Sequence, residues 1–247
     1  MSTVLVEQRG QVLHVVMARP ERRNAFNAEL IEELQLALAD VGDARAVVLS
    51  GQGGSFSAGA DADWMRSSVD LTYEENCADA ERFRLMLRTL DECPAPTIAR
   101  VHGHAMGGGA GLVACCDVAL SAPDTVFAFS EAKLGLVPSV ISPFVIARIG
   151  TTYARRYFVT GERFSSEAAV AMGLVHATPD DLDATVDGVV AEILTCGPEA
   201  SRTAKRIARE RPQGTATSEL IATVRSTPEA QEGLRAFLEK RAPSWLG

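Results

Sequence analysis

The sequence is short of the residues that indicate metal binding or a disulfide-stabilised secreted protein. Its 247 residues include 4 histidines and 5 cysteines. The histidines have no carboxylate or cysteine at ligand spacing, and the cysteines form no disulfide framework. Cys115 and Cys116 fall in an apolar helical run, where we expect buried free thiols. We therefore predict no bound metal and a reducing compartment.

Long apolar runs and basic clusters are also missing. No uninterrupted run reaches the roughly 20 apolar residues of a membrane-spanning helix, and the N-terminus lacks the apolar core of a presequence. The 24 basic residues form no patch for nucleic acid or membranes, and 32 acidic residues give a net charge of -8. We expect a cytoplasmic protein without nucleic-acid or membrane partners, in which local charges hold any anionic ligand.

What is present is a hydrophobic pattern typical of a parallel α/β fold. At 47% hydrophobic residues, the chain is able to bury a large core. β-rich runs alternate with turns and amphipathic helices, an order that favours parallel strands joined by crossover helices. The predicted strands cover residues 4–6, 12–16, 46–49, 97–101 and 118–120, and the predicted helices begin after Asn27, at Tyr73 and near Gly107. The first two strands flank a turn and predict a hairpin.

The pattern changes after residue 195. Gly197-Pro198 interrupts it, and the remainder is mostly helical, with a last helix predicted over 232–241. We therefore divide the chain into a core of residues 1–195 and a helical region of residues 196–247. The second region is too small for an independent core and is expected to pack on the first or on another subunit.

Two turns of very small residues follow predicted strands. Residues 57–61 (SAGAD) follow one strand, and residues 106–112 (MGGGAGL) follow another. Without a Cβ, a backbone N–H comes close to a ligand, and a helix that begins near Gly107 adds unpaired N–H groups. Two such amides on one oxygen form an oxyanion hole. A close packing point between helix and strand is the other interpretation, and the spacing leaves both open.

One carboxylate stands out beyond these turns. Glu131 stands at the end of the segment 126–131 (VFAFSE), directly after a run of mostly apolar residues. A carboxyl group among apolar residues has a raised pKa and is suited to moving protons. The alternative is an ordinary glutamate in the first turn of a helix, where its charge favours the helix N-terminus.

Taken together, these segments identify a family. The chain resembles the crotonase, or enoyl-CoA hydratase/isomerase, superfamily over essentially its full length. The matching segments are residues 22–27 (RRNAFN), 56–61 (FSAGAD), 103–109 (GHAMGGG), 116–119 (CDVA) and 130–138 (SEAKLGLVP). The resemblance implies an α/β fold, a spiral of ββα repeats with a helical C-terminal trimerisation region. It also implies an acyl-CoA substrate and assembly as a homotrimer or a dimer of trimers.

The resemblance also assigns site residues. The N–H groups of Ala60 and Gly108 would hold the thioester oxygen, and Glu131 would be the acid/base residue. Phe237 and Lys240 would reach the CoA bound to a neighbouring subunit. The other residues expected along the CoA arm are Arg22, Arg23, Ala25, Ala58, Asp61, Ala62 and Asp63. No separate cofactor or metal is implied, because coenzyme A is part of the substrate.

The chain departs from the family at Gly111, where many hydratases carry a second glutamate. One carboxylate suffices to move a proton between two carbons, which favours a Δ3,Δ2-enoyl-CoA isomerase. Residues 108–117 and 133–143, however, resemble hydratases of 3-methylglutaconyl-CoA and isohexenylglutaconyl-CoA, in leucine and isoprenoid breakdown, which also lack that glutamate. We therefore favour a hydratase in which Glu131 handles both proton and water. A catalytically weak CoA-binding paralogue is a third possibility.

A glutaconyl-type substrate carries a second carboxylate, which needs a cationic or hydroxyl partner in the acyl pocket. The candidates in the sequence are Arg66, Arg84, Arg88 and Ser142. Nothing in the sequence selects among them. The helix predicted from Tyr73 to Leu90 borders the acyl pocket in the family, so we expect the answer there or near residues 139–143.

Overall fold

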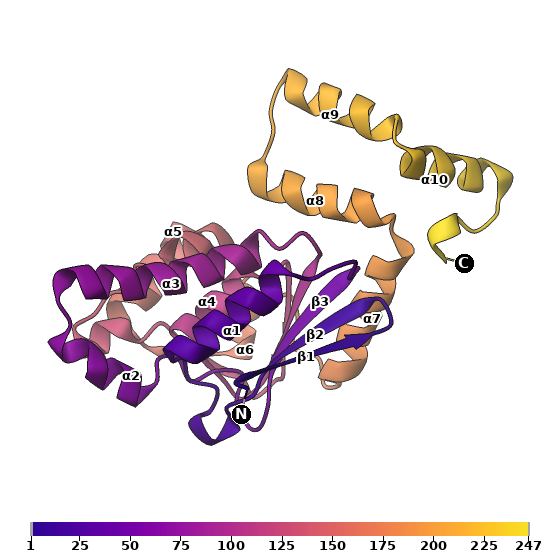
Figure 1. The fold of residues 1–247 in the computed structure, drawn as a ribbon. Helices are drawn as coiled ribbons and strands as arrows, with labels where there is room; N and C mark the ends of the chain where they lie inside the picture. The colour runs from indigo at the N-terminus through magenta and orange to yellow at the C-terminus, as the bar shows by residue number, and fades with distance from the viewer. Residues whose placement is uncertain (1, 247) are drawn as a thin grey trace.

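The computed structural model describes residues 2–246 and contains the predicted parallel sheet (Figure 1). Within these residues, the main sheet has five strands in the order β1-β2-β3-β4-β6. The strands are β1 (Val4–Arg9), β2 (Val12–Met17), β3 (Ala46–Gly51), β4 (Thr97–Val101) and β6 (Val118–Ser121). β1 and β2 form the expected antiparallel hairpin, and every later pairing in this sheet is parallel.

Helices cover both faces of the sheet. Along β3, Val47 and Leu49 pack in the large core beneath α1 and α3, whereas Ala46 and Val48 face α7 on the other side. This alternation is the period of two that a strand buried on both faces requires. The helices of this part are α1 (Ala28–Ala39), α2 (Ala62–Ser67), α3 (Tyr73–Asp91), α4 (Gly108–Cys115), α5 (Ser142–Thr160), α6 (Ser166–Ala171) and α7 (Leu182–Thr195).

Local sequence explains where two of these helices begin. The side chain of Asn27 accepts a hydrogen bond from the Leu30 amide at 2.9 Å, which confirms it as the N-cap of α1. At α3, Thr72 and Glu75 form a reciprocal capping box. Short 3₁₀ turns lie at η1 (Pro20–Arg22), η2 (Ser68–Asp70), η3 (Glu131–Leu134) and η4 (Ser244–Leu246).

A second sheet, absent from the sequence prediction, connects the two small-residue turns. Its strands β5 (His104–Met106), β7 (Val126–Ala128) and β8 (Arg163–Ser165) pair in the order β5-β7-β8. Strands of three residues are too short to show a reliable alternation of apolar and polar residues. An isolated bridge between Ser57 and Ala105 ties the first turn to this sheet directly before the second turn.

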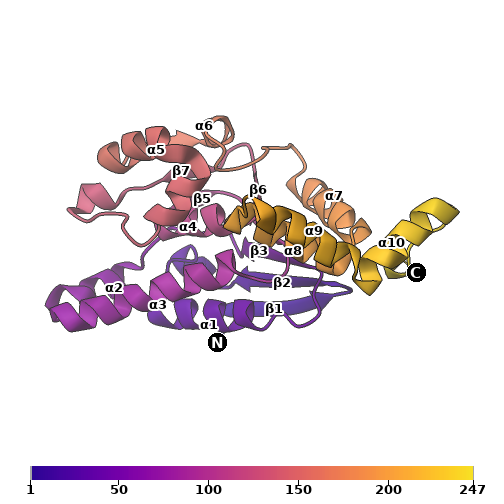
Figure 2. The ribbon, with the colours of Figure 1, turned by 90° about the horizontal axis from the view of Figure 1, so that it is seen from above.

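The C-terminal helices extend away from the sheet. α8 (Pro198–Glu210), α9 (Thr215–Arg225) and α10 (Pro228–Glu239) form an arm, and α10 lies at the end of the molecule opposite α2 in both views (Figures 1 and 2). The last helix begins at Pro228, earlier than predicted, because Thr227 caps it and proline is accepted in a first turn. Lys205 on α8, whose side chain is 9% exposed, forms an ion pair of 2.8 Å through Nζ with the half-buried Asp117, and this pair anchors α8 to the core.

The cysteines agree with the expectation of buried free thiols at positions 115 and 116. Cys115 and Cys116 are buried, and the cysteines within residues 2–246 are all free thiols. No helix in the described part of the chain combines the length and the apolar character that crossing a bilayer requires.

Candidate active site

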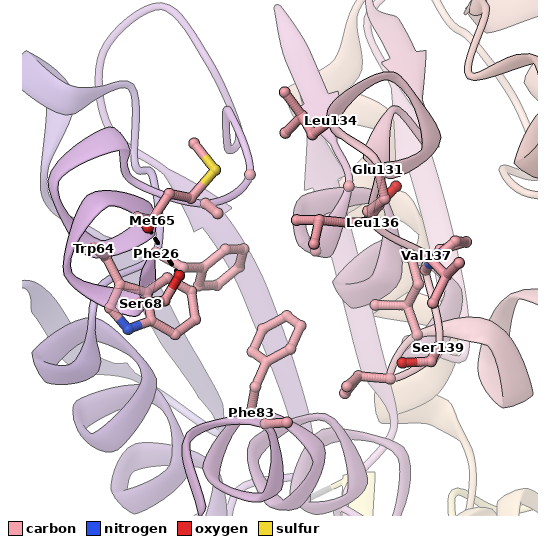
Figure 3. Close-up of a pocket in the computed structure, with 18 of the residues that line it drawn as sticks. Phe26, Trp64, Met65, Ser68, Phe83, Glu131, Leu134, Leu136, Val137 and Ser139 are labelled. Carbon is pink, nitrogen blue, oxygen red and sulfur yellow. Dashed lines mark hydrogen bonds between the residues drawn. The ribbon is translucent and has the colours of Figure 1, made fainter. Parts of the chain in front are cut away.

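A cavity of about 450 Å³ lies between α2–α3 and the segment that begins at η3 (Figure 3). In the close-up, Trp64, Met65 and Ser68 stand on one side, with Phe26 and Phe83 beside them. The labelled residues on the facing side are Glu131, Leu134, Leu136, Val137 and Ser139. Both small-residue turns also reach this cavity, through Ala58–Ala60 and Met106–Gly108. The structure therefore brings the predicted turns and Glu131 into one site.

The Ala60 amide is left free by the pairing around it. Phe26 donates its N–H to Gly59 O at 2.7 Å and accepts from the Asp61 N–H at 2.9 Å. In an extended segment, alternate N–H groups point in opposite directions, so the Ala60 N–H points away from Phe26. It has no hydrogen-bond partner among residues 2–246, although Ala60 lines the cavity. This amide is available to a ligand oxygen.

Gly108 supplies a second free amide. It is the first residue of α4, where the N–H has no partner within the helix, and none is present elsewhere in residues 2–246. Gly107 precedes it with φ +48°, a conformation suited to glycine. A Cβ on Gly108 would stand 2.6 Å from Phe83 Cζ and 3.1 Å from Phe26 Cε2. Only glycine lets the α4 N-terminus approach these rings so closely.

The packing interpretation of the glycine stretch is correct for its later members. A Cβ on Gly109 would lie 2.8 Å from Ser57 Cβ, and one on Gly111 would lie 2.5 Å from Ile141 Cγ2. The stretch therefore has two purposes: its start exposes an amide to the cavity, and its continuation allows close packing. At Gly111, Ile141 occupies the space that any side chain would need, so a glutamate does not fit there without a shift of Ile141.

Glu131 faces the cavity beside the second turn. Its Oε1 would lie 3.0 Å from a Cβ on Gly107. Its Oε2 is buried without a hydrogen-bond partner in the described residues. Burial raises the pKa of this carboxyl above its ordinary value, and a hydrogen bond from its own backbone N–H only partly opposes that effect. A carboxyl with a raised pKa and a vacant lone pair is suited to exchanging protons with a ligand.

Asp79 is a cavity residue that the sequence analysis missed. It lies on α3 one turn before Phe83, and both side chains line the cavity. The helical period of the sequence could have revealed Asp79, because residues four apart share a helix face and Phe83 lies four residues later. Asp79 and Glu131 are the only charged residues that the described lining contains.

The residues expected along the CoA arm form one cluster near the first turn. Ala58 donates its N–H to Arg23 O at 2.9 Å, and Arg22 pairs with Asp63 at 3.1 Å on the surface. Ala25 is buried and Ala62 is exposed. The Asp61 side chain points inward: it caps α2 through the Asp63 amide and pairs with Arg19 at 3.0 Å. The structure thus brings residues 22–25 and 58–63 together.

Phe237 and Lys240 are separate from that cluster in the single chain. Both belong to the end of α10, which lies far from α2 and α3 (Figure 2). Phe237 is 79% exposed. Neither residue is part of the described cavity lining.

The candidates for a partner to a second substrate carboxylate do not line the cavity. Arg66 pairs with Asp63 at 2.6 Å, and the Arg84 guanidinium forms two bonds to Glu81 at 2.6 and 2.7 Å. Arg88 pairs with Glu92, and Ser142 donates to Ser139 O. Each of the four is absent from the described lining.

Comparisons with known proteins agree on one family. The family model described as enoyl-CoA hydratase/isomerase matches residues 7–247. A putative enoyl-CoA hydratase of Thermus thermophilus is 32% identical, over 96% of this chain and 98% of the relative. The crystal structure of an enoyl-CoA hydratase from Shewanella pealeana superimposes with a TM-score of 0.94 at 36% identity, covering 98% and 96% of the two chains. A putative enoyl-CoA hydratase/isomerase (crotonase) from Legionella pneumophila gives 0.93 at 37% identity, covering 99% of each.

Proposed function

This chain belongs to the enoyl-CoA hydratase/isomerase family, and from that premise we propose that it adds water reversibly across the 2,3 double bond of an enoyl-CoA thioester. The observation that carries this proposal is the convergence on one cavity of two unpartnered amides and a carboxyl with a raised pKa. Such amides match the charge that develops on a thioester oxygen when its α-carbon becomes an enolate.

In the proposed reaction, the thioester oxygen accepts hydrogen bonds from the Ala60 and Gly108 amides. The Glu131 carboxylate takes a proton from a water molecule as the water oxygen attacks C3, and the electrons of the double bond move to the thioester oxygen. Glu131, now protonated, then returns its proton to C2. The product gains a hydroxyl at C3 and a hydrogen at C2. Each amide donor is worth about 3–4 kcal/mol of barrier in comparable sites.

The same groups also support isomerisation, which is the second candidate function. Glu131 would take a proton from C2 of a 3-enoyl-CoA and return it to C4, without water. The observation in favour is that Ile141 fills the space beside Gly111, so that position holds no second carboxylate. Incubation with a 2-enoyl-CoA and with a 3-enoyl-CoA separates the two. Hydration removes the absorbance of the conjugated thioester, whereas isomerisation creates it.

A catalytically weak CoA-binding paralogue is the third candidate. It predicts measurable affinity for acyl-CoA, with no turnover of either enoyl-CoA.

The C-terminal arm has a proposed binding role of its own: Phe237 and Lys240 would contact the CoA of a neighbouring subunit in a trimer. We retain the division into a core of residues 1–195 and a helical region of residues 196–247 as a proposal.

The identity of the acyl group of the substrate is a separate question. Resemblance to glutaconyl-CoA hydratases supports 3-methylglutaconyl-CoA, in branched-chain breakdown, as a substrate to test. The cavity weighs against it, since the only charged side chains in the described lining are acidic. Turnover of 3-methylglutaconyl-CoA at a higher kcat/KM than that of uncharged 2-enoyl-CoAs would favour the glutaconyl assignment.

The role of Glu131 is tested with Glu131→Gln, which keeps the shape of the side chain and removes its acid/base chemistry. We expect kcat to fall by about 10²–10⁴-fold, the usual contribution of a general acid–base group, while the affinity for a saturated acyl-CoA changes little. Glu219→Gln on α9, an exposed position far from the cavity, is the control. A Glu131→Gln enzyme with near wild-type turnover would remove Glu131 from this role.

A further inference from the structure

The cavity wall formed by α3 changes character along the helix. Phe83 packs against the start of α4, and Asp79, Ala80 and Asn76 continue the same lining face. Because a helix rises 1.5 Å per residue, Asp79 lies about 6 Å and Asn76 about 10 Å from Phe83 along the helix axis, toward the N-terminus of α3. With the thioester held at Gly108, the far end of an acyl group that follows this wall meets Asp79 and Asn76.

Asp79 has no cation within the cavity. Its side chain is 20% exposed, and its ion-pair partner, Arg82 at 3.6 Å, is 61% exposed and is not among the lining residues. The other charged group in the described lining is Glu131, again a carboxylate. A second carboxylate brought into this cavity would meet like charge on two sides.

Two polar neighbours of Asp79, Asn76 on α3 and Ser68 on η2, have already used their donors, whereas the Trp64 indole N–H on the same side of the cavity has no hydrogen-bond partner in the described residues. The Asn76 amide group donates to Leu71 O at 3.1 Å and Thr72 O at 3.0 Å. Ser68 Oγ donates to Met65 O at 2.8 Å, the bond drawn in Figure 3. These residues therefore present oxygen acceptors to the cavity. The remaining lining hydroxyls, those of Ser130 and Ser139, belong to the wall that carries Glu131.

We propose that this cavity rejects acyl groups that end in a carboxylate and selects uncharged ones, and that Asp79 is the residue responsible. The inference rests on the proposed binding of an acyl-CoA. A carboxylate needs hydrogen-bond donors or a cation when it leaves water. Apart from the Trp64 indole N–H, this end of the described lining offers acceptors and a like charge. The rings of Trp64 and Phe83 and the Met65 side chain remain to bury a hydrocarbon group.

Two substrates of similar size and branching test the proposal. Glutaconyl-CoA ends in a carboxylate, and 5-methyl-2-hexenoyl-CoA carries two methyl groups where the carboxylate has its oxygens. We expect kcat/KM for glutaconyl-CoA to be lower by about 100-fold, because nearby like charges repel strongly at the effective permittivity of a protein site. Equal or faster turnover of glutaconyl-CoA would overturn the proposal.

Asp79→Asn identifies the residue responsible. It should narrow the ratio of kcat/KM between the two substrates at least tenfold, chiefly by raising kcat/KM for glutaconyl-CoA. Asp70→Asn is the matched control: it removes the same charge at an exposed position outside the cavity lining and should leave the ratio unchanged. A ratio that Asp79→Asn leaves unaltered would contradict the assignment to Asp79.

A binding measurement separates this inference from the proposed reaction. Glutaryl-CoA and 5-methylhexanoyl-CoA are saturated, so their affinities, measured by calorimetry, do not depend on turnover. Weaker binding of glutaryl-CoA, relieved by Asp79→Asn, supports the inference even for an enzyme that hydrates neither enoyl-CoA. Equal affinities of the enzyme for the two saturated ligands would contradict the inference and leave the proposed function standing. If neither ligand binds, both the proposed function and the inference are wrong.

Discussion

Two carboxyl groups near the same cavity have opposite pKa shifts because their hydrogen bonds differ. Burial acts to raise the pKa of Asp61, but the Asp63 amide and the Arg19 guanidinium outweigh it and lower the pKa. Burial also raises the pKa of Glu131, where Oε2 finds no donor in the described residues. Asp61 is thus fixed as a structural anion, whereas Glu131 is left ready to exchange a proton.

The raised pKa of Glu131 predicts a pH-dependent effect on stability. Because the folded state binds this proton more tightly than the unfolded state, the stabilising contribution is present below the unfolded pKa and is lost as pH rises through the folded pKa. Glu131→Gln has no such loss. We expect the melting temperature of Glu131→Gln relative to wild type to increase from pH 4 upward and then level off.

Thermal unfolding across this pH range checks the prediction, with Glu219→Gln as a control whose difference from wild type should stay flat. For a chain of this size, 1 kcal/mol corresponds to about 2–4 °C in melting temperature. A difference that shrinks as pH rises would mean that the Glu131 pKa is lowered in the folded protein.

At the scale of elements, the glycines of α4 allow this helix to pack closely between the cavity and the start of α5. Helix propensity favours alanine over glycine by about 1 kcal/mol, but a Cβ at Gly111 would lie 2.5 Å from Ile141 Cγ2. Overpacking of this kind costs about 1–3 kcal/mol. The contact with Ile141 therefore decides the outcome at Gly111, and it also explains why a carboxylate does not fit there.

We predict that Gly111→Ala destabilises the protein by up to about 2 kcal/mol, the cost of the clash less the gain in helix propensity. In an Ile141→Ala background, the same change should be neutral or stabilising, because the obstructing methyl group is gone. Urea unfolding of the four proteins in this double-mutant cycle gives the coupling. Gly111→Ala that stabilises the otherwise unchanged protein would show that Ile141 moves aside freely.

At the scale of the whole molecule, the C-terminal arm exposes apolar side chains that a partner would bury. Phe237 and Leu238 are 79% and 76% exposed, and Leu234 is 50% exposed. Exposed apolar groups on one helix are typical of an interaction surface. A second copy of the chain is the partner that the proposed trimer supplies.

We predict that the full chain sediments as a trimer or a hexamer, multiples of its 26.3 kDa mass, and that Leu238→Glu shifts it toward smaller species. Charge at an exposed position of a single chain has little cost, whereas in an interface it would be desolvated. Analytical ultracentrifugation at micromolar concentration gives the result, and Leu36→Glu, exposed on α1, is the control. A wild-type monomer would contradict the prediction.

The sequence by itself determined the strands of the main sheet, the starts of α1, α3 and α4, and the family. The hairpin, the parallel strands, the Asn27 cap and the matching motifs all depend on local patterns, because period, turn residues and capping act over a few residues. It therefore singled out Glu131 and both small-residue turns, which the structure brings to one cavity.

Only the tertiary structure decided what those residues face. The three-residue strands of the second sheet are too short to be predicted, yet they bring the turns together. Contacts between distant segments determine that Ile141 fills the space beside Gly111 and that Asp79 lines the same cavity as Glu131. Burial and hydrogen-bond partners are properties of such contacts, and they cannot be read from neighbours in the chain.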